Sequence, residues 1–396
     1  MMTLRLKPPK SPIVMAIHLR LATIALLVTS AFCWQLPLAH AQGGRQRGGG
    51  DSVDLESQQG AAELQTAIGL TQRGKFREAI PHFLAARGHV PDEYLVNFNL
   101  ALCYVGTGKY KQAIDLLNQI RADGRATVEV QDLLTQAYVG NGQQGPAFAA
   151  FQDAAKMAPR DERMYVRDSE ACMDGGAYEL GLKIVDLGLQ HLPNSGRLHF
   201  ERGMLLVQLD ELDDARHDLA QVAGLSPGTH IAFIAAAQNS LLDGNVTDAM
   251  RVAKEGIEKS HSHFMLLTIF GEAALRAGVQ PGQPEFAEAQ GALEKAVAEN
   301  PSYPSSQIAL GKIYMMQNRT EDAIARLNAG RQLDPQNPAV YSNLAVAYRK
   351  SGDLQREMEM LAILAKLNKA QAEKIAAAPG DTRAGYGASS SHRHQQ

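Results

Sequence analysis

Apolar residues occur along the chain in short clusters that combine small and large side chains, and turn-forming residues separate the clusters. These turn residues return every 34 positions until residue 278, and six inserted residues then delay the next one. The turn positions are Gly74, Gly108, Gly142, Gly176, Asp210, Gly244, Gly278, Asn318 and Gly352. A fixed period of this length indicates a repeat whose unit is one supersecondary structure.

At each of two fixed distances from the turn, eight of the nine residues are small. Seven positions before it are Ala67, Ala101, Thr135, Ser169, Gly203, Ala237, Gly271, Gly311 and Ala345. Five positions after it, or eleven where the insert intervenes, are Ala79, Ala113, Ala147, Gly181, Ala215, Ala249, Ala289, Ala323 and Glu357. A small residue on each of two antiparallel helices allows their axes to approach to about 8 Å. A larger apolar residue four positions after the second small one is expected to fill the adjacent groove.

This pattern resembles the tetratricopeptide repeat, whose unit is a helix–turn–helix of 34 residues. The last two units match best, "YPSSQIALGKIYMMQNRTEDAIARLNAGRQLDPQNP" and "AVYSNLAVAYRKSGDLQREMEMLAILAKLN". Cys172, Ser240 and Glu357 depart from the family's usual residue types. The resemblance implies an all-α fold, a right-handed superhelical solenoid of about nine helix-turn-helix tetratricopeptide repeats. The units expected are residues 60–93, 94–127, 128–161, 162–195, 196–229, 230–263, 264–303, 304–337 and 338–371.

The start of the chain has the features of an export signal. Four basic residues precede the apolar run "LATIALLVTSAFCW", and Ala39-His40-Ala41 has the small-x-small pattern of a cleavage site. We expect residues 1–41 to be a signal peptide cleaved after Ala41, so that the protein is periplasmic or secreted. The alternative is an uncleaved leader, which would be the chain's contact with the membrane.

The remaining segments outside the repeats are short. Residues 42–59 are predicted to be a flexible linker, and residues 372–378 the end of a capping helix before Pro379-Gly380. Residues 379–396 are predicted to be a disordered tail. Within the array, the insert around residues 279–286 is either a partner-specific loop or a neutral expansion.

Charge and cysteine content narrow the function further. The formal charge of −3 offers no basic surface for nucleic acid. Without residues 1–41 the chain has 35 Lys and Arg (39 minus 4) against 42 acidic residues, a balance of −7. The remaining cysteines, Cys103 and Cys172, lie two repeats apart, whereas a disulfide needs Cα atoms within about 7 Å. We expect two free, mostly buried thiols.

No catalytic or cofactor motif emerges. The stretch "GTGK" at residues 106–109 lacks the first glycine and the Ser/Thr of a phosphate-binding loop, so Gly108 is interpreted as a helix–helix turn. His261-Ser262-His263 and His392-Arg393-His394 have no Cys or carboxylate at ligand spacing. Asp213-Asp214 and Glu321-Asp322 are expected in the first turns of helices, where they favour the helix dipole. The chain is therefore expected to be no enzyme and to bind no metal or cofactor.

Function then depends on surfaces. The family resemblance implies that the first helices form a concave groove for an extended peptide or helix. The groove positions transferred by register are Leu64, Ile68, Leu95, Phe98, Leu102, Val105, Glu129, Asp132, Arg163, Val166, Arg197, Phe200 and Met204. An alternative left open is that several of these side chains pack against a neighbouring repeat or a bound N-terminal segment. The family's clamp for chaperone C-termini is absent, since only Asn99 fits and Leu64 and Ile68 replace the required polar residues.

The main hypothesis is a non-enzymatic protein–protein interaction scaffold of the bacterial cell envelope, acting in envelope assembly or secretion. One alternative is a glycan- or peptidoglycan-binding module, against which the absence of tryptophan after Trp34 counts. The other is a regulatory subunit of a separately encoded enzyme.

Overall fold

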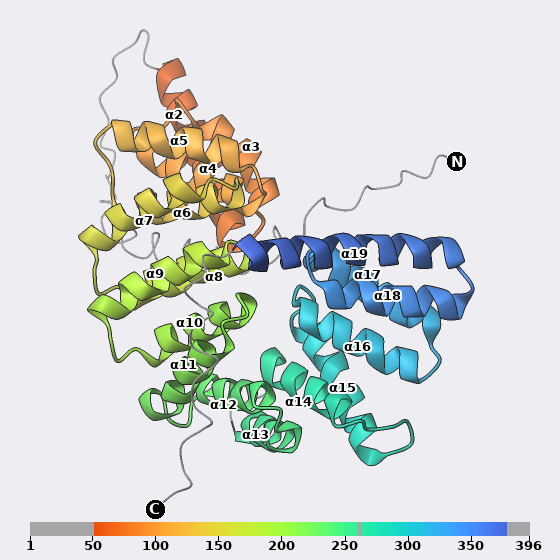
Figure 1. Cartoon of the computed structure of the whole chain (residues 1–396). Coiled ribbons are helices and arrows are strands. Elements are labelled where there is room, and N and C mark those ends of the chain that lie inside the picture. The colour runs from red at the N-terminus through yellow and green to blue at the C-terminus, as the bar shows by residue number, and fades with distance from the viewer. Residues whose placement is uncertain (1–50, 260–262, 378–396) are drawn as a thin grey trace, which may run out of the picture. The chain divides into compact units, whose positions relative to one another are not determined.

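The computed structural model describes residues 51–259 and 263–377, and every regular element in these ranges is an α-helix (Figure 1). The first helices of the pairs are α2 (Asp51–Gln72), α4 (Glu93–Gly106), α6 (Val128–Gly140), α8 (Glu162–Asp174), α10 (Gly196–Gln208), α12 (His230–Leu242), α14 (Phe264–Arg276), α16 (Pro304–Met316) and α18 (Pro338–Ser351). The second helices are α3 (Phe76–Ala86), α5 (Tyr110–Ala122), α7 (Gln144–Met157), α9 (Tyr178–His191), α11 (Leu212–Leu225), α13 (Val246–Lys259), α15 (Pro284–Glu299), α17 (Thr320–Leu333) and α19 (Leu354–Ala377). The chain is thus an all-α helical-repeat solenoid.

The turn inside each helix pair has the same backbone conformation. All nine periodic turn residues have positive φ, including Asp210 at 63° and Asn318 at 61°. Around Gly108, which has a φ of 74°, the N–H groups of Gly108 and Lys109 donate to Val105 and Tyr104 carbonyls at 3.0 and 2.8 Å. The left-handed residue therefore ends the first helix and satisfies its free carbonyls, as in a helix C-cap. The interpretation of Gly108 as a helix–helix turn is confirmed.

The small periodic residues lie where paired helices approach most closely. All are buried. A Cβ on Gly203 would lie 2.8 Å from Leu219 Cγ, and one on Gly311 would lie 2.7 Å from Leu327 Cγ. These separations are too short for a methyl group, so the glycines are required by the approach of a leucine from the second helix. The leucines come from the larger apolar positions noted in the sequence.

The chain divides into two compact units. In the first, whose described part comprises residues 51–259, 263–279 and 295–302, consecutive helices pack on each other from α2 to α7 and from α8 to α14. The Phe151 and Tyr165 rings connect α7 to α8, with centroids 5.4 Å apart. First helices also contact each other from repeat to repeat, as α4, α6, α8 and α10 do. In the second unit, residues 280–294 and 303–377, the core contains Ile308, Leu327, Val340 and Leu344. Each unit thus forms its core between successive repeats.

The linker expectation is corrected in part. Residues 51–59 are helical, because α2 begins at Asp51 and continues without a break into the first repeat. A Cβ on Gly60 would lie 2.5 Å from His89 Cβ, so this part of α2 packs against the segment that follows α3. The predicted leader, residues 42–50, His261 and residues 379–396 lie outside the described residues.

Two further observations concern the interior and the helix lengths. Cys103 and Cys172 are free and fully buried, as predicted, and burial raises the pKa of Cys103 to about 12. Burial also raises the pKa of Cys172. Within residues 51–259 and 263–377, no helix combines the length and the apolar character needed to cross a bilayer.

Candidate partner-binding surface

The apolar part of the expected groove is mostly core. Phe98, Leu102 and Val105 are at most 1% exposed and belong to the core cluster of the first repeats. Leu64 and Ile68 are half-buried and pack against that cluster, and Leu95 is also half-buried. The sequence carried a signal for this burial, because "EYLVNFNLALCYVG" of α4 is apolar on almost every side, as buried helices are. In this structure these side chains do not line an open groove.

The middle part of the expected groove is more accessible. Arg163 is exposed, while Val166 on the same helix and Arg197 and Met204 on α10 are half-buried. Phe200 is buried, and the Arg197 guanidinium lies 5.8 Å from its ring centroid. Since α8 and α10 contact each other, the structure brings these residues onto two neighbouring first helices. We call Arg163, Val166, Arg197 and Met204 the middle surface.

Ion pairs connect the first helices at and near the middle surface. Arg167 of α8 lies 2.8 Å from the carboxylate of Asp132 of α6, which is buried. Arg197 of α10 pairs with Glu170 of α8 at 2.7 Å and with Glu201 at 2.9 Å. Glu129, the other acidic groove position, is exposed. Sequence patterns did not reveal Asp132 or Glu170 as partners, because residues 27 and 35 positions apart meet only after the repeats stack.

Asp168 is a buried acid next to these ion pairs. It is fully buried; Gln136 Nε2 lies 3.5 Å from its Oδ1, and its Oδ2 has no hydrogen-bond partner. Burial and the neighbouring Asp132 raise the pKa of Asp168 well above its usual range, although Arg167 opposes this. This arrangement favours the protonated form of Asp168.

His199, His230 and His263 are held by contacts between helices. His199 Nδ1 faces Asp218 at 2.8 Å and its Nε2 faces the Pro193 carbonyl at 3.1 Å, which fixes the ring between α10 and α11. His263 stacks on His230 with ring centroids 5.2 Å apart, and burial lowers the pKa of His263 to about 4. Across residues 51–259 and 263–377, no group of three His, Cys, Asp or Glu side chains is arranged to hold a metal.

The acid pairs occupy the positions expected for the helix dipole. Asp213 and Asp214 lie in the first turn of α11, and Glu321 and Asp322 in the first turn of α17. Asn99, the one residue that fitted the chaperone clamp, is buried and donates to the Leu95 carbonyl at 2.8 Å. None of these residues forms part of a binding constellation.

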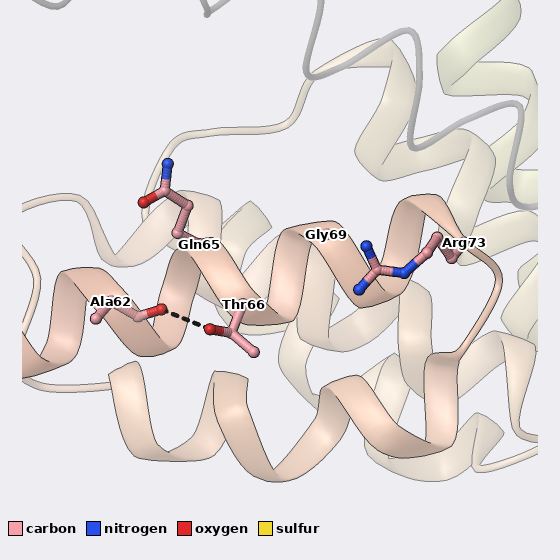
Figure 2. Close-up of a pocket in the computed structure, with 5 residues that line it drawn as sticks. All are labelled: Ala62, Gln65, Thr66, Gly69 and Arg73. Atoms are coloured by element: carbon pink, nitrogen blue, oxygen red, sulfur yellow. Dashed lines mark hydrogen bonds between the residues drawn. The ribbon is translucent and has the colours of Figure 1, made fainter.

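A pocket of about 460 Å³ lies along α2 (Figure 2). It is lined by Ala62, Gln65, Thr66, Gly69 and Arg73. The Thr66 hydroxyl donates to the Ala62 carbonyl at 2.9 Å, and Arg73 is the one ionisable group of the lining. The lining of this pocket contains no acid–base pair.

Comparison with known proteins identifies the repeat. The tetratricopeptide repeat model matches residues 70–137, and a second TPR repeat model matches residues 311–352. Curated proteins give no match to this sequence.

Solved structures resemble this chain at low sequence identity. Yeast Tom70 is 15% identical with a TM-score of 0.50, over 90% of this chain and 72% of its own. A tetratricopeptide repeat protein from Parabacteroides merdae is 16% identical with a TM-score of 0.47, over 63% of this chain and 97% of its own. With the repeat matches in both units and the nine helix pairs of the described residues, the chain is a tetratricopeptide repeat protein.

Proposed function

We propose that this protein is a non-enzymatic scaffold that holds a protein partner against the middle surface on α8 and α10. Tetratricopeptide arrays generally bind proteins through the surface of their first helices. The observation that carries the proposal is the accessibility of Arg163, Val166, Arg197 and Met204 on adjacent first helices, while their counterparts on α4 are largely buried. A partner peptide or helix would find both charged and apolar groups there.

The chemistry of this surface favours a partner with an acidic side chain. The exposed side chain of Arg163 has no ion-pair partner among the described residues, whereas Arg197 is engaged by two glutamates. Val166 and Met204 supply half-buried apolar contacts beside it. An acidic group next to an apolar side chain would therefore match the surface, with the charge guiding the encounter.

The test is affinity capture from envelope extract of the native organism with the unchanged chain and Arg163→Glu. Recovery of a specific partner should fall about ten-fold, because the substitution replaces attraction by repulsion. Lys183→Glu is the matched control, since Lys183 is exposed on the second helix α9 and lies outside the middle surface. Equal recovery by both variants would contradict the proposal.

The proposed location is the bacterial cell envelope, in envelope assembly or secretion. Its support is the sequence of residues 1–41, with basic residues, an apolar run and a cleavage pattern at Ala41. Protein isolated from the native organism should have Gln42 as its N-terminus and should be recovered from periplasm or medium. An N-terminus at Met1 or Met15 would show that the leader is retained.

A further inference from the structure

The turn between α12 and α13 contains a sequence that can accept a glycan. Residues 245–247 are Asn-Val-Thr and have the pattern Asn-x-Ser/Thr, in which x is any residue except proline. In an exported protein this pattern marks an N-glycosylation acceptor when it lies in a surface loop. Residues 318–320, Asn-Arg-Thr, have the same pattern, whereas Pro301 excludes residues 300–302. The chain therefore offers two candidate asparagines, and the structure distinguishes them.

Asn245 has an accessible amide nitrogen. Asn245 and Thr247 are both exposed, the first in the turn and the second in the first turn of α13. The Asn245 Oδ1 accepts a hydrogen bond from the Asp248 N–H at 3.2 Å and so satisfies one of the free N–H groups at the start of the helix. Among the described residues, the Asn245 Nδ2 has no hydrogen-bond partner. A sugar joined to Nδ2 would leave Oδ1 in place as the cap.

Asn318 is held more tightly. It is the left-handed residue of its turn, with a φ of 61°, and its Oδ1 accepts a hydrogen bond from the Lys350 Nζ of α18 at 2.5 Å. The same ammonium group donates to the Met315 carbonyl at 3.2 Å, so the Asn318 side chain lies in a contact between two successive repeats. A bulky glycan on this amide would crowd that contact. The fold therefore favours Asn245 as the acceptor.

The surroundings of Asn245 are open. Gly244 has a φ of 74°, and a Cβ placed on it would meet nothing within 4 Å, so this turn stands clear of the neighbouring helices. Asp243, two positions before Asn245, has a side chain that is 55% exposed although Arg216 lies 3.0 Å away. An enzyme with a basic subsite could bind this carboxylate beside the acceptor. The motif at residues 318–320 has a methionine at the equivalent position.

We propose that Asn245 is an acceptor for an N-linked oligosaccharide, which an oligosaccharyltransferase transfers from a lipid diphosphate carrier. The Asn245 Nδ2 forms a bond to C1 of the first sugar, and the bond between C1 and the diphosphate oxygen breaks. The lipid diphosphate leaves with that electron pair, and the proton lost from Nδ2 passes to a base of the transferase. The inference rests on the proposed location, because the transfer follows export, but it does not depend on the middle surface.

The test is mass spectrometry of the full chain, purified without glycan and incubated with a bacterial oligosaccharyltransferase and a lipid-linked oligosaccharide. The tryptic peptide of residues 217–251, which contains Asn245, should gain the mass of one oligosaccharide. Thr247→Val should abolish the transfer, and Thr247→Ser should retain it, because the motif requires a hydroxyl two positions after the asparagine.

Two further variants provide matched controls. Asn245→Asp should abolish the transfer without loss of stability, since a carboxylate still caps α13 but has no amide nitrogen. Thr320→Val, which destroys the other motif, should leave the added mass unchanged. The proposal is overturned if Asn245 stays unmodified while the same enzyme modifies a synthetic peptide of residues 241–249. Transfer that survives Thr247→Val, or transfer to Asn318 in place of Asn245, overturns it as well.

Protein isolated from the native organism separates this inference from the proposed location. A chain that begins at Gln42 and carries an oligosaccharide on Asn245 supports both. A chain that begins at Gln42 but has an unmodified Asn245 overturns the glycan site and leaves the location standing. A chain that retains its leader contradicts the location, and the reaction with purified components then decides the glycan site alone.

Discussion

The two ends of the described repeat array carry different residues at positions that are buried or half-buried in the other repeats. Twelve and eight positions before the turn, the first repeat has Ala62 and Thr66, both exposed. The second repeat has Val96 and Leu100 there, at most 1% exposed. At the other end, Met358 and Leu361 remain apolar although they are exposed. The first repeat is thus finished with small and polar side chains, whereas the last repeat keeps those of an interior repeat.

This difference shows how a repeat array separates folding from association. Each repeat must cover the face of its neighbour, and an end stays soluble and monomeric when its outer face is polar. The α2 face with Gln65, Thr66 and Arg73 meets that requirement (Figure 2). The face of α19 that carries the exposed Leu354, Met358 and Leu361 does not.

Asp168 provides the complementary case inside the array. It stands eight positions before its turn, as Thr66 does, but it is fully buried and one carboxyl oxygen has no hydrogen-bond partner. A polar group at this position is therefore solvated at the end of the array and desolvated within it. The energetic consequence of a residue type depends on whether another repeat follows.

The largest effect is expected when the leucine nine positions after the turn is replaced. The same position is compared in an interior repeat, at Leu327, and in the last repeat, at Leu361. Leu327→Ala should lower the free energy of unfolding by about 3 kcal/mol, because Leu327 is fully buried. Leu361→Ala should lower it by less than about 1 kcal/mol, since that side chain is 41% exposed. Urea unfolding at low protein concentration measures both, and equal losses would remove the distinction between interior and end.

A smaller effect is expected from the buried acid. Because the folded-state pKa of Asp168 is raised, the native state holds the proton, and the associated stability is present at low pH and lost as pH rises through that pKa. Asp168→Asn cannot ionise and should stabilise the protein by about 1–2 kcal/mol at pH 8. The gain should shrink towards pH 4. Urea unfolding across this range tests the sign, and a gain that grows on acidification would contradict it.

Replacing a turn glycine should cost the same stability in an interior repeat as in the last repeat. Gly142 and Gly352 have φ values of 74° and 83°, and a Cβ at either would meet nothing within 4 Å. Replacing either by alanine should cost about 1 kcal/mol, since the left-handed conformation alone is unfavourable. Thermal unfolding of the two variants provides the measurement. A much larger loss at Gly142 would reveal packing that the structure does not show.

The smallest effect is expected at the first repeat. Thr66→Leu should change the free energy of unfolding by less than about 0.5 kcal/mol, because the side chain stays exposed on α2. The reverse change one repeat later, Leu100→Thr, should cost several times more because Leu100 is buried. Parallel urea titrations would test this, and a large gain from Thr66→Leu would mean that the α2 face is covered in solution.

Much of the fold could be predicted from local sequence. The 34-residue spacing located every turn, and all nine turn residues adopt the left-handed conformation that Gly, Asn and Asp tolerate best. The small residues identified the helix contacts, as the fit of Leu219 against Gly203 shows. The surface was harder to predict. Phe98 and Leu102 occupy groove positions in the register but are buried, and helical residues 51–59 had the composition of a linker.

The sequence by itself determined the unit, its length, its turns and its small contact residues, because these depend on neighbours within one helix pair. Only the tertiary structure decided which side chains remain accessible and which charges meet. Arg167 meets Asp132 through the stacking of successive repeats, whereas Met358 stays 65% exposed. Whether a side chain is buried depends on the residues that pack against it, and in this array many of those residues belong to the neighbouring repeat.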